Sequence, residues 1–254
     1  MVFETLKVVI EEDIGKLTLN QPDKLNPLGT NTLQEIIDAT AWFDEQKVPV
    51  VIISSRGRAF SAGFDLREFT NPNQGGKNGA ALGKQMADAI ENMNAVAIAA
   101  VHGHCIGGGV VLVGACDLRI AATNTSFSIP EIDLGIPLAW GGIPRLVREI
   151  GPAMTRELVM TCRPFTAEEA KSIGFINRIV DVAELEQEAL DMAASISQRP
   201  QSVIQTTKRQ VQSAAEDLAS TQNEWIGEIL IDAAGQNKEA RLSAQKYLEG
   251  KNSS

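Results

Sequence analysis

The sequence predicts an α/β fold followed by a helical region, from three observations. Strand-like and helix-like patterns alternate along the chain to about residue 181, and only helical patterns dominate after that point. Residues 50–53 and 95–101 are apolar on both faces, as the buried strands of layered α/β folds are. The length of 254 residues suits one large domain with a single core, with or without a small appendage.

Each element follows from a local pattern. A turn at residues 11–13 joins two alternating runs into a hairpin. Apolar side chains at helical spacing, from Leu33 to Phe43, predict the first helix. The stretch 71–79, rich in glycine and asparagine, is expected to be a surface loop. The strands are expected at residues 2–10, 14–20, 50–54, 95–101, 118–121 and 178–181, and the helices at 30–46, 80–94, 107–114, 152–161, 166–172 and within 182–247.

Composition and charge narrow the class of protein. A net charge of −9 argues against a binder of duplex nucleic acid, which needs a basic surface. No apolar run reaches the roughly 20 residues of a membrane span, and no signal peptide is recognised at the N-terminus. Cys105, Cys116 and Cys162 have no CxxC spacing and are expected to be buried free thiols. The chain is therefore predicted to be cytoplasmic, with no nucleic-acid or membrane partner.

Two junctions between a predicted strand and a helix are the candidate functional segments. Residues 58–66 read RAFSAGFDL, and residues 102–109 read HGHCIGGG. Small residues let a ligand approach the backbone, and the unpaired N–H groups at a helix N-terminus favour negative charge. Two such junctions in one fold allow two N–H donors to meet at one oxygen. The alternative for the triple glycine is tight helix packing alone. Neither segment has a nucleotide-binding glycine pattern.

Five stretches of the sequence together resemble the enoyl-CoA hydratase/isomerase (crotonase) family. AFSAGFDL at 59–66 is similar to the first oxyanion-hole motif of the family, and AAVHGHCIGGG at 99–109 to the second. CDLRIA, from residue 116, and FSIPEIDLGIP, over 127–137, are similar to the segment with the catalytic carboxylate. LNQPDKLNPL at 19–28 is similar to the early segment that contacts coenzyme A. The similarity extends over about residues 3–181, in order and with family-like spacing.

This resemblance implies an architecture and a ligand. The expected fold is the crotonase (ClpP-like) spiral of ββα units over residues 1–190, with the coenzyme A and active sites, and a helical oligomerisation region over 191–254. Such helices pack in homotrimers of the family, or in homohexamers formed as dimers of trimers. The implied substrate is an acyl-CoA thioester. Coenzyme A enters as part of this substrate, and no cofactor is expected to be bound permanently.

The resemblance also implies three catalytic groups. The backbone N–H groups of Phe64 and Gly108 would hold the thioester oxygen while it gains charge, as in other oxyanion holes. Glu131, after Pro130, matches a catalytic carboxylate of the family. A carboxylate that is partly desolvated has a raised pKa and can move a proton. A solvated loop glutamate is the alternative for this residue.

One position departs from the pattern of family hydratases. They carry a second glutamate two residues after the triple glycine, where this chain has Val111. Water addition benefits from two carboxylates, whereas moving a double bond from C3 to C2 can use one. The sequence therefore resembles the Δ3,Δ2-enoyl-CoA isomerases with a single glutamate, and Glu131 is predicted to be the proton shuttle. An enoyl-CoA hydratase, a lyase of fatty acid metabolism, is the runner-up.

Candidate contacts to coenzyme A lie in the early segment and around the first motif. Lys24 and Arg58 are candidate cations for its phosphates, with a solvated surface charge as the alternative for each. Asp65 is more readily a helix cap than a catalyst. Trp140 is expected either in the acyl pocket or in the plain core. The candidate binding positions are Lys24, Leu25, Arg58, Ser61, Ala62, Gly63, Asp65 and Leu66.

Other chemistry has little support in the sequence. His102 and His104 lack a third ligand of suitable spacing, so no metal site is expected. No serine or cysteine elbow motif supports a nucleophilic reaction. Three hypotheses therefore remain: an isomerase that uses Glu131 alone, a hydratase or another enolate-forming enzyme, and an acyl-CoA binding protein with little turnover.

Overall fold

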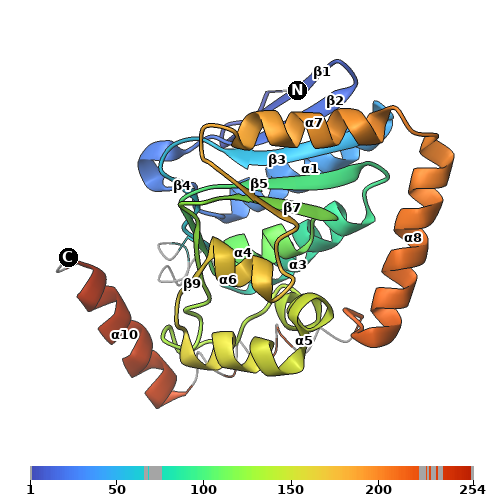
Figure 1. Ribbon diagram of the computed structural model, residues 1–254. Coiled ribbons are helices and arrows are strands. Elements are labelled where there is room, and N and C mark those ends of the chain that lie inside the picture. The colour runs from blue at the N-terminus through green and yellow to red at the C-terminus, as the bar shows by residue number, and fades with distance from the viewer. Residues whose placement is uncertain are drawn as a thin grey trace.

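The chain is built around a six-stranded sheet, shown in a computed structural model that describes residues 2–65, 68, 76–222, 227, 229, 233 and 237–252 (Figure 1). The strands in spatial order are β1 (Leu6–Glu11), β2 (Ile14–Leu19), β3 (Val50–Ser55), β5 (Val96–Val101), β7 (Leu118–Ala122) and β10 (Arg178–Val180). The first two strands form the predicted antiparallel hairpin, and all other neighbours are parallel. Parallel neighbours require crossover connections, which the helices supply.

A second, smaller sheet lies beside the first. Its strands in spatial order are β4 (Ala59–Ser61), β6 (His104–Ile106), β8 (Ser126–Ser128) and β9 (Phe165–Thr166). Each of β4, β6 and β8 follows one strand of the large sheet and precedes a helix, which confirms the expected spiral of ββα units. These short strands were not predicted from the sequence, because two or three residues are too few to show an alternating pattern. Both candidate junctions therefore continue from the small sheet.

The helices fill the connections and the C-terminal part of the described chain. They are the 3₁₀ helix η1 (Pro22–Lys24) and the α-helices α1 (Thr30–Glu45), α3 (Gly76–Asn92), α4 (Gly108–Gly114), α5 (Gly142–Thr161), α6 (Ala167–Ser172), α7 (Leu185–Ser197), α8 (Gln201–Leu218) and α10 (Lys238–Asn252). Residues 76–79, expected in a loop, belong to α3, so that prediction was wrong there. Residues 71–75 lie outside the described part.

The helix expected at residues 152–161 begins earlier, at Gly142. Gly151 interrupts it with a φ of 72° and a ψ of 165°, and Pro152 follows with no N–H to donate. Gly151 therefore divides α5 into two consecutive helical segments. The sequence pattern therefore revealed only the second segment.

Residues 50–53 of β3 and 96–101 of β5 are buried on both faces of the large sheet, as predicted. Val51 and Ile53 belong to the core under α1, α3 and α4, whereas Val50 and Ile52 belong to a second core under α7. In Figure 1, α7 crosses one face of this sheet and α1 lies on the other. The expected boundary after residue 190 falls inside α7. The division into two regions, and the oligomerisation role of the later helices, stay predictions.

The cysteines are all free. Cys105 and Cys116 are buried, and Cys162 is only partly so, which corrects the expectation for that residue. Burial raises the pKa of Cys116 to about 12 and also raises the pKa of Cys105, so both stay protonated at neutral pH. Among the residues that the structure describes, no helix has the length and apolar character needed to cross a membrane.

Candidate active site

The first junction lies directly against the early segment that was expected to contact coenzyme A. The N–H of Ala62 donates to the carbonyl oxygen of Leu25 at 2.9 Å, and the N–H of Leu28 donates to the carbonyl oxygen of Gly63 at 2.8 Å. Leu25 has a left-handed φ of 62°, which turns the chain after η1. Residues 19–28 and 59–65, far apart in sequence, are therefore side by side.

The backbone of Phe64 presents its N–H group away from this contact. Phe64 forms a parallel bridge with Leu28 in which the N–H of Leu28 bonds to the preceding residue, Gly63. In such a bridge the central residue of the other strand keeps its own N–H on the opposite side. No acceptor for the N–H of Phe64 occurs among the described residues. This group is therefore available to a ligand.

In the second junction, a glycine in an unusual conformation directly precedes helix α4. Gly107 has a φ of 52° and donates its N–H to Ser128 of β8 at 2.9 Å. Its carbonyl oxygen accepts from Val110 at 2.8 Å, which begins α4. The N–H of Gly108 lies before this first helical bond, and no described residue accepts from it.

The two junctions meet at Gly63. A Cβ atom at this residue would lie 2.7 Å from the carbonyl oxygen of Ile106 and 3.5 Å from the nitrogen of Gly108. The φ of Gly63 is also left-handed, at 83°. A side chain is therefore excluded on both counts, and the close approach explains why glycine stands here. The fold thus brings both expected donors to one place.

Glu131 lies in the turn that follows β8, and its side chain is buried. A Cβ atom at Gly107 would lie 2.4 Å from its Oε1 atom, so the carboxylate touches the second junction. Its Oε2 atom is buried and has no hydrogen-bond partner among the described residues. Burial raises its pKa to about 7, against a smaller lowering by its own backbone N–H. The alternative of a solvated loop glutamate is therefore wrong.

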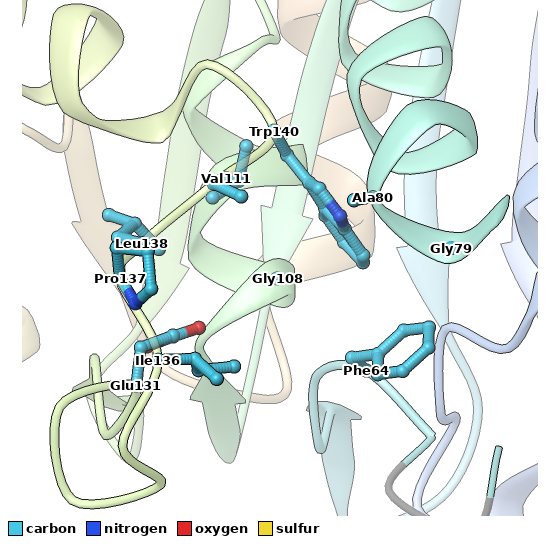
Figure 2. Close-up of a pocket in the computed structure, with 11 residues that line it drawn as sticks. Phe64, Gly79, Ala80, Gly108, Val111, Glu131, Ile136, Pro137, Leu138 and Trp140 are labelled. Carbon is cyan, nitrogen blue, oxygen red and sulfur yellow. The ribbon is translucent and has the colours of Figure 1, made fainter. Parts of the chain in front are cut away.

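A pocket connects these groups. Figure 2 shows Glu131 on one side, Phe64 and Trp140 on the other, and Gly108 between them. Glu131 is the only titratable side chain among the described residues that line the pocket, and Val111 lies on its apolar wall. The lining residues are Phe64, Gly79, Ala80, Gly108, Val111, Glu131, Ile136, Pro137, Leu138, Ala139 and Trp140. The arrangement combines two backbone donors, one acid with a raised pKa and apolar walls.

The C-terminal helix α10 supports the turn that carries Glu131. A Cβ atom at Gly135 would lie 2.3 Å from the carbonyl oxygen of Ala240, and the hydroxyl of Ser243 donates to the carbonyl oxygen of Asp133 at 3.0 Å. This contact was not predicted from the sequence. Gly135, with a φ of 71°, was the only local signal, and a glycine in a turn does not reveal what packs against it.

Apart from Phe64, Gly108 and Glu131, none of the predicted positions that the structure describes lines this pocket. Ser61 is fully buried, and its hydroxyl donates to the carbonyl oxygen of Asn26 at 2.8 Å and accepts from the N–H of Gly63 at 3.1 Å. Lys24 and Arg58 are exposed, and Asp65 is partly buried beside Phe64. Leu66 lies outside the described residues. In the described chain, no group of three metal-ligating side chains is placed to hold an ion.

Comparisons with known proteins agree with one another. The chain matches the model of the family described as "Enoyl-CoA hydratase/isomerase" over residues 9–254. It is 36% identical over 238 residues to the "Crotonyl-CoA hydratase" of Syntrophomonas wolfei, covering 92% of this chain and 90% of that protein. A solved enoyl-CoA hydratase structure from Geobacillus kaustophilus is similar with a TM-score of 0.78 and 29% identity, over 98% of this chain and 96% of that one. A solved methylmalonyl-CoA decarboxylase in complex with 2-nitronate-propionyl-CoA is similar with a TM-score of 0.87 and 25% identity, over 98% and 97% of the two chains.

Proposed function

The chain belongs to the enoyl-CoA hydratase/isomerase family, and we propose that it moves the double bond of a 3-enoyl-CoA thioester to C2, with Glu131 as the proton shuttle. The observation that carries this proposal is the single acid of the pocket. Glu131 is its only titratable side chain among the described residues, and Val111 is apolar and buried. One acid suffices for a proton transfer from C2 to C4, whereas hydration benefits from two.

The backbone donors stabilise the charge that forms during the reaction. When a proton leaves C2, the electrons pass into the thioester and its oxygen becomes negative. The N–H groups of Phe64 and Gly108, with no acceptor among the described residues, are available to that oxygen. Donors of this kind, held in place before reaction, contribute about 10²–10³-fold each in rate.

Glu131 carries the proton between the two carbons. Its carboxylate removes a proton from C2 of the 3-enoyl chain, and the resulting carboxylic acid returns a proton to C4. The C3–C4 double bond becomes the C2–C3 double bond, and the carboxylate is regenerated. A pKa of about 7 suits this exchange, because the group both accepts and releases a proton near neutral pH.

The coenzyme A part of the substrate is proposed to lie over the early segment and the first junction. The hydrogen bonds of Ala62 to Leu25 and of Leu28 to Gly63 support this, since they join the two segments. Lys24 and Arg58 are exposed and can offer cations to phosphates. The contact positions remain as predicted from the resemblance: Lys24, Leu25, Arg58, Ser61, Ala62, Gly63, Asp65 and Leu66.

The decisive experiment replaces the acid by its amide. Glu131→Gln is expected to lower isomerisation of 3-enoyl-CoA by about 10²–10⁴-fold, the usual contribution of a general acid–base group. A matched control is the affinity for a saturated acyl-CoA, which the amide should keep. Undiminished isomerisation of 3-enoyl-CoA in this variant would overturn the mechanism.

An isotope experiment tests whether one group carries the proton. With 3-enoyl-CoA deuterated at C2, a single shuttle that exchanges slowly with water delivers part of the label to C4 of the product. The product is analysed by mass spectrometry and NMR after a single turnover. Absence of deuterium from C4 of the product at every reaction time would argue for separate acids or for a solvent-exposed base.

Hydration of 2-enoyl-CoA is the second candidate, and the names of the relatives favour it. The Syntrophomonas relative is a crotonyl-CoA hydratase, and a relative from Clostridium acetobutylicum is named a short-chain-enoyl-CoA hydratase. Assays of the purified protein against 3-enoyl-CoA and 2-enoyl-CoA separate the two reactions directly. If the protein binds acyl-CoA esters but turns over neither substrate, it acts as a binding protein.

A homotrimer or a dimer of trimers, in the cytoplasm, completes the proposal. Helix α8 has no buried residue in the single chain and exposes Val203, Val211 and Leu218. A helix with exposed apolar side chains is commonly covered in an assembly. Sedimentation of the purified protein measures the oligomeric state.

A further inference from the structure

The indole ring of Trp140 occupies a space that two glycines leave open. A Cβ atom at Gly83 of α3 would lie 1.9 Å from its Cε2 atom, and a Cβ atom at Gly108 would lie 2.3 Å from its Cζ3 atom. The ring therefore fits between α3 and the start of α4 only because neither position carries a side chain. Figure 2 shows it across the pocket from Glu131.

Phe64 continues this aromatic wall. Its ring centroid lies 6.0 Å from that of Trp140, with an angle of 86° between the ring planes. This edge-to-face arrangement is favourable for aromatic pairs. Gly79, one turn before Gly83 on α3, leaves room for Phe64, because a Cβ atom there would lie 2.8 Å from its ring. Two helix-interior glycines thus permit two rings to close the same side of the pocket.

The backbone of Trp140 is held in a conformation that a tryptophan rarely adopts. Its φ is 62°, and that of Gly141 is 68°. Such backbone persists only where the surroundings enforce it. Arg145, which is 2% exposed, donates from one nitrogen to the carbonyl oxygens of Trp140 at 3.0 Å and of Gly141 at 3.3 Å.

The same arginine ties this turn to α3. Its other terminal nitrogen donates to Asp88 at 2.9 Å and to Glu91 at 2.5 Å, and both acids belong to α3. The planar guanidinium group reaches both sides at once, which the single ammonium group of a lysine cannot do in the same way. Arg145 therefore fixes the turn of Trp140 relative to the helix on which the indole packs.

We propose that the indole of Trp140 is the end wall of the acyl pocket and restricts this site to thioesters with short acyl chains. The proposal rests on the proposed acyl-CoA function of the same pocket. The wall touches Gly108, whose N–H is the proposed donor to the thioester oxygen, so little space separates the thioester from the indole and only a short acyl chain fits there. Arg145 is a positioning residue that keeps the wall in place.

Binding measurements test the wall without depending on the reaction. The dissociation constants of butyryl-, hexanoyl- and decanoyl-CoA are measured by calorimetry for the wild type and for Trp140→Ala. One added methylene in a closed apolar pocket typically changes discrimination by about 10–200-fold. We therefore expect Trp140→Ala to raise the decanoyl-to-butyryl affinity ratio by at least about tenfold. A ratio unchanged from the wild type would overturn the proposal.

Trp42→Ala is the matched control. Trp42 is partly buried on α1, packs against Phe43 with ring centroids 5.3 Å apart and does not line the pocket. The Trp42→Ala variant loses the same side-chain atoms at a site outside the pocket, so its decanoyl-to-butyryl affinity ratio should equal that of the wild type. A shift as large as that of Trp140→Ala would mean that general loosening, and not the wall, sets chain length, and would also overturn the proposal.

Arg145→Lys tests the positioning role. This variant keeps the positive charge near Asp88 and Glu91 but loses the paired contacts to the two carbonyl oxygens. It should shift the affinity ratio in the same direction as Trp140→Ala, and it should add no further shift in a Trp140→Ala background. Additive shifts in the double variant would contradict the positioning role.

The outcomes also separate this inference from the proposed function. Turnover with an unchanged affinity ratio in Trp140→Ala retains the function and rejects the wall. A shifted ratio without turnover of either enoyl-CoA retains the wall and rejects the reaction. Failure of the wild type to bind any acyl-CoA rejects both.

Discussion

Gly107 and Glu131 are in direct contact, since a Cβ atom at residue 107 would lie 2.4 Å from the Oε1 atom of the carboxylate. The acid is therefore adjacent to the residue that precedes the proposed donor Gly108. Gly107 also has a φ of 52°, a value that residues with side chains rarely adopt. The second junction and the acid thus form one unit, and a change at Gly107 acts on both.

Gly107→Ala is expected to reduce kcat by roughly 10²-fold, because a displacement of about 1 Å among reacting groups costs about that much. Gly114→Ala, at the end of the helix that Gly107 precedes, is the control. Its Cβ atom would meet Phe175 at 3.8 Å and Arg145 at 4.0 Å, which are ordinary contacts. Steady-state kinetics and thermal unfolding of both variants check this. Equal kcat values for the two variants would contradict it.

The pH dependence of isomerisation should report the ionisation of Glu131. Burial raises its pKa to about 7, and the base must be ionised to remove a proton from C2. We expect kcat/KM to rise with pH through about 7 and to level above it. The residual activity of Glu131→Gln should lack this rise. An inflection near the ordinary value of 4.5 would mean that the acid is solvated when substrate binds.

The same pKa predicts how stability changes with pH. Between 4.5 and about 7 the folded protein keeps the proton on Glu131 while the unfolded chain releases it. This group therefore lowers the stability of the wild type as pH rises through that window, and the loss is complete above the folded pKa. Glu131→Gln removes the effect. The free energy of unfolding of the variant, relative to that of the wild type, should therefore be higher at pH 8 than at pH 4 by up to about 3 kcal/mol. Urea unfolding at both pH values measures this, and an equal difference at both would contradict it.

Val111→Glu should change the balance of reactions. Val111 is buried and lines the pocket together with Glu131. It occupies the position at which the resemblance implies a second acid in the hydratases of the family. A carboxylate there is expected to raise hydration of 2-enoyl-CoA relative to isomerisation, because it can orient and activate water. Val111→Gln is the control, since it has the same shape without a basic oxygen. If both variants raise hydration equally, the size or the polarity of the new side chain causes the change, and the side chain does not act as a base.

Much of the fold followed from local patterns. The alternating hairpin and the apolar runs at residues 50–53 and 95–101 are visible within a few residues, and the structure confirms them as β1, β2, β3 and β5. The strands of the small sheet were missed because they are short and gain their hydrogen bonds from distant segments. The first segment of α5 was missed because Gly151 and Pro152 suggest a helix start, although the helix continues through an interruption.

The sequence by itself determined the chemical groups of this protein: the glycine-rich junctions with Phe64 and Gly108, Glu131 after Pro130, and Val111 in place of a second acid. These are properties of single positions and short motifs. Only the tertiary structure decided that Gly63 meets Gly108, that Glu131 is buried enough to raise its pKa to about 7, and that Trp140 stands between Gly83 and Gly108. Distances, desolvation and packing depend on which distant segments the fold brings together, and no local pattern specifies them.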